Sequence, residues 1–426
     1  MPRQLPRAGY PVLPCRMCRR RPSAFRRIAS ALTACLLGLS LLGCAPEVTP
    51  ETPTDYGTAG ASLARSLAAA HPFRKAWGPG EQAAGDWILA ELRKMGFEPE
   101  IVSFEVPVAE DGQEESENAL SPTPAEAPVR RSRNLVVRIG GTGFLVPDGS
   151  PSPTAGAVEP EWIPERRWVL VGAHYDTALG TEADREAAPG FNGIQDNAAG
   201  VAAVLVMARE LLERQPGYDV VIVFFGAGED GQAGARHFAA SLDAGELASL
   251  DAVYTVDGLY AGDRLYAHSG WNSTAAGKKY DMRRKLYEMT DVAIQGKIDL
   301  RTNQADLDVD LDGDGVTEVY REVTLRESDY RPFDQLGIPC VHMDSGDYFI
   351  ESVGDFAESR NPAFAATGGY ISGTASDDFR LLEPLLEEGR LLKRVNTAAF
   401  LLVGAIEKGL AGAVRPPTPT PAPTGR

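Results

Sequence analysis

Three apolar runs between Trp168 and Asp257 restrict the folds open to this chain more than any other feature. The runs read W-V-L-V-G-A-H, D-V-V-I-V-F-F and D-A-V-Y-T-V, and none of them alternates between apolar and polar residues. Continuous β-branched and aromatic runs of this length are typical of strands buried on both faces. The runs therefore predict a sheet covered by helices on both sides, as in α/β folds.

Each of these runs is followed at once by acidic or imidazole side chains. In open α/β sheets, functional sites lie outside the carboxyl ends of the strands, so we expect these groups to converge at one sheet edge. The groups are His174 and Asp176 after the first run, Asp196 just ahead of a helix-like segment, Glu229 and Asp230 after the second run, and Asp257 after the third.

Several carboxylates and an imidazole cannot share a dry pocket unpaired, because like charges repel and desolvation is unfavourable. A divalent cation resolves this conflict. Imidazole and carboxylate ligands without thiolate suit a catalytic zinc, and a further carboxylate can act as the base toward water. The alternative is a set of ordinary strand-end and helix-cap acids, which the convergence of so many groups disfavours.

The motifs G-A-H-Y-D-T, D-N-A-A-G and G-E-D-G in combination resemble those of the di-zinc exopeptidases of the bacterial leucyl aminopeptidase type. Glutaminyl cyclase and the transferrin-receptor ectodomain share that fold. The resemblance spans about residues 62–410. It implies a three-layer α/β/α domain with a mixed, mostly parallel central sheet.

The resemblance also implies a set of metal ligands. His174, Asp196 and Asp257 would hold one zinc, and Asp196 would bridge to a second zinc that Asp230 also ligates. Asp230 stands where the family usually has glutamate. Asp176 would orient His174, as carboxylates commonly do for ligand imidazoles.

A larger departure from the family lies near the C-terminus. The family's last ligand is a histidine in a Y-H-T-x-x-D segment, whereas this chain reads I-S-G-T-A-S-D-D, with Gly373 at the histidine position. Glycine has no ligand atom, so we expect one tightly bound zinc and leave the second open. His342 is the first alternative ligand. The segment S-D-Y-R-P-F resembles the family's S-D-H-x-x-F, with Tyr330 replacing histidine.

The activity implied by the resemblance is hydrolysis of peptides, as a zinc aminopeptidase with Glu229 as the general base. Two alternatives remain. One is a catalytically weakened or inactive binding module, which the loss of histidine at Gly373 favours. The other is a different amide hydrolase or an acyl transferase of the cyclase type, which the loss of histidine at Gly373 disfavours.

The N-terminus is typical of an export signal. Basic residues at 19–27 precede a short apolar segment at 28–42, which ends L-L-G-C and resembles a bacterial lipoprotein signal with Cys44 as the lipidated residue. Met17 would give a more usual leader length. We therefore expect a signal peptide at 1–43, a tether at 44–56 and an extracytoplasmic protein anchored in the bacterial cell envelope, or a secreted one if Cys44 is not lipidated.

The charge balance excludes some partners. The 426 residues carry a net charge of −17, and without residues 1–43, which contain eight arginines and no acid, 34 basic and 59 acidic residues give −25. Such an acidic body argues against nucleic acid as a partner.

Beyond the leader only Cys44 and Cys340 remain, so no disulfide framework is expected, and Cys340 fits a small buried apolar residue. The oligomeric state is not determined by these features.

A second cation site is indicated by the run D-L-D-V-D-L-D-G-D-G-V-T-E at residues 306–318. Its spacing matches a calcium loop, although position 12 is an arginine, and a solvated acidic turn is the alternative. The calcium ligands would be Asp310, Asp312, Asp314, the carbonyl of Val316, and Glu318.

The remaining segments complete the predicted organisation. One peptidase domain covers 57–411, with loop insertions near 109–131, 146–160 and 301–320, and a Pro/Thr-rich tail at 412–426. Helices are predicted within 62–96 and 381–410 and at 197–214 and 233–242, and strands at 101–106 and 133–139.

Overall fold

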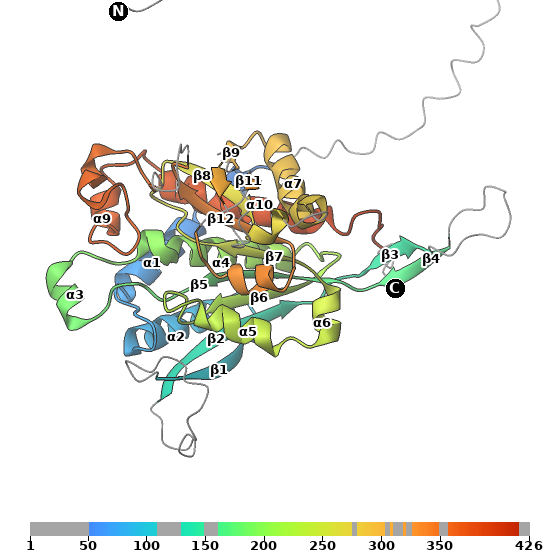
Figure 1. The fold of residues 1–426 in the computed structure, drawn as a ribbon, viewed down its shortest axis with the longest axis horizontal. Helices are drawn as coiled ribbons and strands as arrows, with labels where there is room; N and C mark the ends of the chain where they lie inside the picture. The colour runs from blue at the N-terminus through green and yellow to red at the C-terminus, as the bar shows by residue number, and fades with distance from the viewer. Residues whose placement is uncertain are drawn as a thin grey trace, which may run out of the picture. The chain divides into compact units, whose positions relative to one another are not determined.

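An eight-stranded sheet runs through the centre of the unit formed by residues 51–426 (Figure 1). The computed structural model describes residues 51–108, 129–148, 161–274, 279–302, 307–309, 318–320, 326–348 and 357–416. The strand order is β1-β2-β6-β5-β7-β12-β8-β9. The strands are β1 (Glu100–Pro107), β2 (Val129–Ile139), β5 (Trp168–His174), β6 (Asp219–Phe225), β7 (Leu250–Val256), β8 (Arg264–Ser269), β9 (Leu300–Arg301) and β12 (Cys340–Gly346).

The four central strands β6, β5, β7 and β12 are parallel to one another, while β1 and β2 on one side and β8 on the other run antiparallel to their inner neighbours. The predicted mixed, mostly parallel sheet is thus confirmed. The three apolar runs are β5, β6 and β7, and nearly all of their residues are buried, because helices cover both sheet faces.

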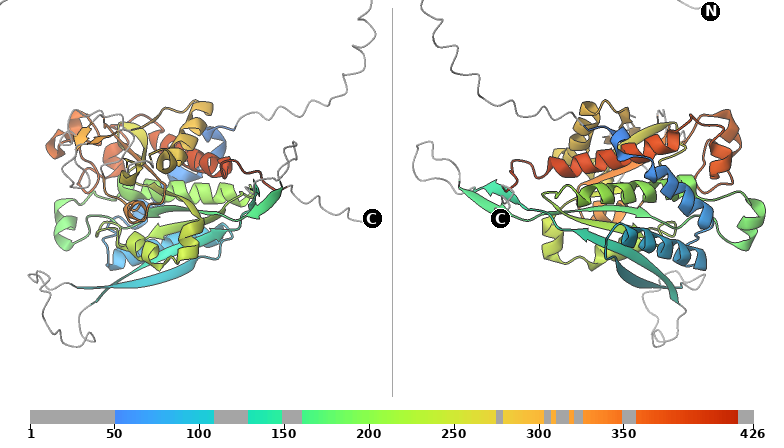
Figure 2. Two further views of the ribbon diagram at one scale, coloured as in Figure 1. Left: turned by 45° about the vertical axis from the view of Figure 1, so that its right-hand side comes forward. Right: turned by 180° about the vertical axis from the view of Figure 1, so that it is seen from behind.

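Helices lie on both sides of the sheet (Figures 1 and 2). The longer ones are α1 (Ala59–Ala70), α2 (Pro79–Lys94), α4 (Ala199–Leu212), α5 (Ala233–Ser241), α7 (Lys279–Gln295) and α10 (Arg390–Lys408). Shorter ones are α3 (Glu182–Ala187), α6 (Ala244–Ser249), α8 (Arg331–Gln335), α9 (Phe379–Leu382), η1 (Pro53–Tyr56), η2 (Ile194–Ala198), η3 (Trp271–Thr274) and η5 (Pro362–Thr367). Among the described residues, none of the helices combines the length and the apolar character that a membrane span requires.

Successive residues of the central strands enter different cores. Val169 and Val171 pack in a large core with α1, α2, α4, α7 and α10, whereas Leu170 packs in a smaller core with α5 and α8. This follows from the period of two in a strand, which sends neighbouring side chains to opposite faces. Helix α4 lies between the sheet and helices α1 and α10 and is buried almost all round, although its last residue, Leu212, is 42% exposed.

Some predicted boundaries differ from the structure. The helix predicted from residue 197 begins at Ala199, because Asp196 and Asn197 have non-helical backbone angles. The terminal helix α10 begins at Arg390, after Gly389 takes a left-handed conformation with φ of 75°. The second predicted insertion begins within β3 (Phe144–Pro147) and ends just before β4 (Trp162–Glu165), and these two strands pair as a hairpin. The third contains the paired strands β10 (Leu307–Val309) and β11 (Glu318–Tyr320).

Several predictions fall outside the described residues. These are the signal peptide, Cys44 and most of the tether, the central parts of the insertions, most of the C-terminal tail, and the calcium-loop residues from Asp310 to Val316. Glu318 begins β11.

Candidate metal centre

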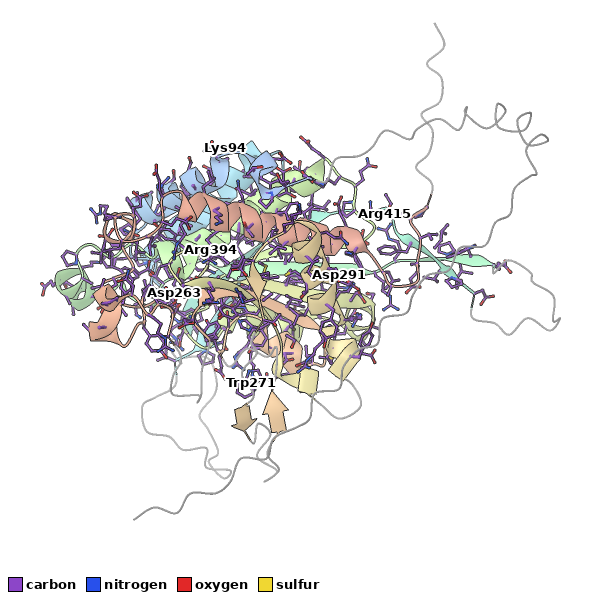
Figure 3. The ribbon with its side chains drawn as sticks, turned by 90° about the horizontal axis from the view of Figure 1, so that it is seen from above. Lys94, Asp263, Trp271, Asp291, Arg394 and Arg415 are labelled. Carbon is purple, nitrogen blue, oxygen red and sulfur yellow. The ribbon has the colours of Figure 1, made fainter. Side chains whose placement is uncertain are left out.

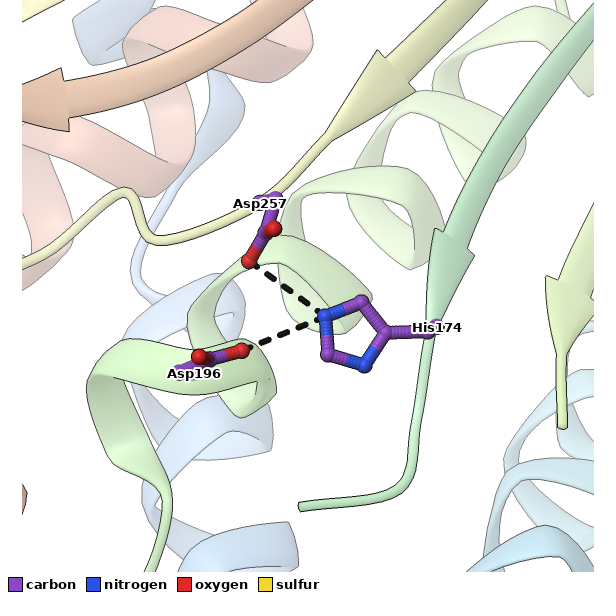
Figure 4. A group of neighbouring side chains, drawn as sticks. All are labelled: His174, Asp196 and Asp257. Carbon is purple, nitrogen blue, oxygen red and sulfur yellow. Dashed lines mark hydrogen bonds and ion pairs between the residues drawn. The ribbon is translucent and has the colours of Figure 1, made fainter. Parts of the chain in front are cut away.

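Three of the residues singled out in the sequence meet at the carboxyl edge of the sheet (Figure 4). His174 is the last residue of β5, and Asp257 directly follows the neighbouring parallel strand β7. Asp196 lies in η2, the turn ahead of α4. The Nε2 atom of His174 is 3.2 Å from Oδ1 of Asp196 and 3.3 Å from Oδ1 of Asp257. One ligand atom from each residue lies within 4.8 Å of the other two.

This arrangement fits a metal ion. A single imidazole nitrogen carries at most one proton and so cannot bridge two carboxylates equally, and Oδ1 of Asp196 accepts no hydrogen bond from the described residues. Burial alone would lower the pKa of His174, but the carboxylates of Asp257, Asp176 and Asp196 raise it well above its usual range. The surroundings therefore stabilise positive charge at this point. One imidazole and two carboxylate ligands are a donor set that suits zinc.

Asp176 connects the end of β5 to the loop after β6. Its Oδ1 lies 3.4 Å from Nδ1 of His174 and accepts a 2.8 Å hydrogen bond from the amide of Gly228. Its Oδ2 accepts a 3.0 Å bond from the amide of Glu229. The same buried carboxylate thus lies against the imidazole and fixes the backbone that carries Glu229.

Glu229 lies beside the cluster, on a wall of the same small pocket. The pocket has a volume of about 130 Å³ and is also lined by His174, Asp196 and Asp257. Burial of the carboxyl group, and then repulsion from Asp196, raise the pKa of Glu229 well above its usual range. The loop needs glycine at position 228, because a β-carbon there would lie 2.3 Å from Cβ of His174.

Asp230, expected as a ligand of the second metal, lies outside this cluster. Its Oδ2 accepts hydrogen bonds from Nε1 of Trp77 at 2.6 Å and from Nη1 of Arg130 at 2.5 Å. The Arg130 guanidinium lies 4.8 Å from the centre of the Trp77 ring, and the Asp230 side chain is 43% exposed. In this conformation Asp230 is held by a cation and an indole at the surface.

Neither Gly373 nor His342 contributes a ligand atom to the cluster. Gly373 has a φ of 66°, and the loop just before it is held by Glu358, whose carboxylate accepts hydrogen bonds from the amides of Ile371 and Ser372. His342 is fully buried on β12, and its Nδ1 lies 2.9 Å from Oγ1 of Thr255.

Two residues from the S-D-Y-R-P-F segment, to which the sequence analysis gave no role, also belong to the site. Ser328 donates a 3.1 Å hydrogen bond from its hydroxyl to Oδ2 of Asp257, so it holds the carboxylate oxygen that faces away from His174. Asp329 is 1% exposed, and no side chain of the described residues donates a hydrogen bond to its carboxylate. Burial raises the pKa of Asp329 to about 7. The resemblance of this segment to a family motif was the signal in the sequence that could have identified these two residues.

A further buried pair fixes the loop of Asp196. Asp377 accepts hydrogen bonds from the amides of Gln195 at 2.7 Å and Asp196 at 3.1 Å. Arg74, fully buried, donates to the carbonyls of Tyr175, Asn192 and Gly193. Asp377 occupies the aspartate position of the G-T-A-S-D stretch, but nothing in the local sequence marks Arg74 for this role.

Comparison with known proteins places this geometry in a family. Residues 157–382, more than half of the chain, match peptidase family M28. The alkaline phosphatase isozyme conversion protein of Escherichia coli (strain K12) is 24% identical over 394 residues, which cover 91% of this chain and 98% of that protein.

Solved structures agree on the fold. A zinc aminopeptidase from Bacillus subtilis superposes with a TM-score of 0.53 at 14% identity, covering 85% of this chain and 97% of the other. A glutaminyl cyclase from an Acidobacteriales bacterium superposes with a TM-score of 0.52 at 19% identity, covering 84% and 96%. The metal-binding cluster and its sheet lie largely within the matched region, and the chain belongs to peptidase family M28, the zinc exopeptidase family that its motifs resemble.

Proposed function

We propose that this protein is a zinc-dependent aminopeptidase that acts outside the cytoplasm. The observation that carries the proposal is the convergence of His174, Asp196 and Asp257 beside Glu229 in one pocket. Family membership supports hydrolysis of peptides. The structural likeness to an aminopeptidase extends the proposal to removal of N-terminal residues.

The roles of the protein's own groups follow from their positions. Zinc bound by the three ligands would polarise the scissile carbonyl and acidify a water molecule. Glu229 would accept the proton of the attacking water and deliver it to the departing amine. Asp176 would keep Glu229 in place through the amides of Gly228 and Glu229.

We further propose that one zinc binds tightly. The other position expected from the resemblance would rely on Asp196, on Asp230, which here is bonded to Arg130 and Trp77, and on residue 373, which is glycine. Two carboxylates without an imidazole would hold zinc weakly.

A glutaminyl cyclase activity is the second candidate. The similarity of the fold to a glutaminyl cyclase favours it. An assay for loss of ammonia from a peptide with N-terminal glutamine separates this reaction from hydrolysis.

The proposed location rests on the N-terminal sequence. The basic and apolar leader followed by Cys44 supports export and attachment to the cell envelope through a lipid. Membrane fractionation of cells that produce the wild type or Cys44→Ala tests this, and an equal distribution of both proteins would contradict lipidation.

The activity is tested with purified protein and zinc on a panel of aminoacyl amide reporters. We expect hydrolysis by the wild type and at least a ~10²-fold lower turnover for Glu229→Gln, because a positioned base contributes about this much. Zinc content and melting temperature should be unchanged in that variant. Near wild-type turnover would remove Glu229 from the mechanism, and no hydrolysis or cyclisation by the wild type would leave a binding module.

A further inference from the structure

A second pocket lies at the N-terminal end of α10, away from the metal cluster and sharing none of its lining residues. It has a volume of about 920 Å³ and is formed by η1 and the residues after it, the turn that follows α7, the start of β8 and the first turns of α10. Its basic lining residues are Arg264, Lys297, Arg390, Lys393 and Arg394. Figure 3 shows Arg394 close to Asp263, toward the opposite end of α10 from Arg415.

Two of these cations are held close together. Nη1 of Arg390 and Nη2 of Arg394 both donate to the carbonyl oxygen of Gly262, each at 3.3 Å. Nη2 of Arg394 also donates to the carbonyl of Asp263 at 3.1 Å. Burial and the neighbouring Arg390 lower the pKa of Arg394 to about 10. Two guanidinium groups that share one neutral acceptor repel each other unless an anion lies between them.

The acidic residues of the wall form no ion pair with Arg390 or Arg394, and they offset only part of the repulsion at Arg394. Asp263 accepts hydrogen bonds from the Ser359 hydroxyl at 2.6 Å and the Arg360 amide at 2.8 Å, and Asp299 pairs with Nε of Arg301 at 2.8 Å. Within the described part of the chain, Glu387 is the lining carboxylate that has no such partner.

The other basic side chains are also without a carboxylate. Arg264, Lys297 and Lys393 are exposed to solvent and form no side-chain hydrogen bond or ion pair with any described residue. The N-cap of α10 is Gly389, which offers no capping side chain, and the first turn contains no acid, so the positive end of this 19-residue helix adds to the positive charge of this region, which Glu387 offsets in part. The lining carries five basic and three acidic residues, an excess of two positive charges in a chain with a net charge of −17.

We propose that this pocket binds a ligand that carries phosphate groups. Guanidinium groups match phosphate oxygens with paired hydrogen bonds, and the lysines add further positive charge around them. The pocket volume is sufficient for a small molecule with more than one phosphate, or for a phospholipid headgroup. The site lies outside the proposed peptidase chemistry and does not depend on it.

The test measures the binding of pyrophosphate to the full-length, zinc-loaded protein. Calorimetry gives the affinity, and the shift in melting temperature gives the stabilisation. Sodium chloride of equal ionic strength serves as the reference. The wild type should bind and melt about 3 °C or more higher when pyrophosphate is in ~100-fold excess over its Kd. The double variant Arg390→Gln/Lys393→Gln should lose at least ~10-fold in affinity. The control Lys408→Gln/Arg415→Gln removes one charge from the last residue of α10 and one from the segment that follows the helix, and it should bind like the wild type.

A parallel titration with soluble dihexanoyl phosphatidylglycerol distinguishes the two sources of phosphate. Tighter binding of pyrophosphate would identify a free phosphate ligand, and tighter binding of the lipid would identify a headgroup. The proposal is overturned if neither probe binds beyond the salt reference, or if the Arg390→Gln/Lys393→Gln protein binds as tightly as the control. If pyrophosphate instead removed zinc from the protein, the melting temperature would fall, which is opposite to the rise expected for binding.

Discussion

At the scale of single residues, the candidate metal centre is a group of carboxylates that no protein donor fully satisfies. Asp196 and Asp257 face one imidazole nitrogen, and Asp329 is buried nearby without a hydrogen bond from any described side chain. Buried carboxylates are unfavourable unless they are protonated, hydrogen-bonded or paired with a cation. The stability of the site should therefore depend on pH when metal is absent.

Asp329 gives the clearest prediction of this kind. Its pKa is about 7 in the folded protein, compared with roughly 3.9 in an unfolded chain. Because the folded value is higher, the favourable contribution of the protonated group is present below about pH 4 and is lost as the pH rises toward 7. In metal-free protein, the free energy of unfolding should fall between pH 4 and 8, with up to about 3–4 kcal/mol of the loss due to this group.

Asp329→Asn should flatten this pH dependence, which urea unfolding in the presence of a zinc chelator would measure at pH 4.5 and 8. Glu182→Gln, which changes an exposed acid on α3, is the control and should leave the dependence intact. An Asp329→Asn protein with the wild-type pH dependence would contradict the assignment.

At the scale of elements, the loops after the strands are fixed to one another by buried side chains. Asp176 holds the loop after β6, and Asp377 holds η2. Arg74 joins the residue that follows β5 to the segment just before η2. These bonds keep the site in one shape although its residues come from segments far apart in the sequence.

The loop at Gly373 provides a test of this organisation. Its φ of 66° lies in the left-handed region, where a side chain costs roughly 1 kcal/mol or more. Gly373→Ala should lower the free energy of unfolding by about that amount, and Gly373→His should carry the same strain before any ligand is gained. Gly140→Ala is the matched control, because an added β-carbon there meets no atom within 4 Å and no positive φ is required. Equal effects of the two alanine variants in chemical unfolding would show that the loop is not strained by a side chain.

At the scale of the whole molecule, the two helical layers bury both faces of the sheet, and the candidate metal centre lies at its carboxyl edge. Among the described residues, the group at this edge that could hold a metal ion is His174, Asp196 and Asp257. We therefore expect about one zinc per chain after dialysis, measured by elemental analysis. Asp257→Asn should lose most of this zinc and melt at a lower temperature, since bound metal stabilises the folded state.

Asp230→Asn is the control for this measurement, because Asp230 lies outside the cluster in the structure. It should retain one zinc. Two zinc ions in the wild type, with one of them lost in Asp230→Asn, would mean that the Asp230 side chain leaves Arg130 and turns toward the site when metal binds.

Much of this architecture can be predicted from the sequence because it depends on local patterns. The unbroken apolar runs of β5, β6 and β7 require burial on both faces, and the parallel strands then bring His174 and Asp257 to one edge. The same patterns could not predict that Asn197 stays outside α4, because its backbone is set by the turn that carries Asp196.

The remaining features depend on contacts between distant segments. Arg74 and Asp377 lie about three hundred residues apart, and only the folded chain brings them to the loop of Asp196. The motif predicted Asp230 as a ligand, but the neighbouring Arg130 and Trp77 decide where its carboxylate points. Sequence by itself determines which residues can bind a metal and at which strand ends they lie. Tertiary structure decides which of them meet, because the electrostatic partners of each carboxylate come from other elements of the fold.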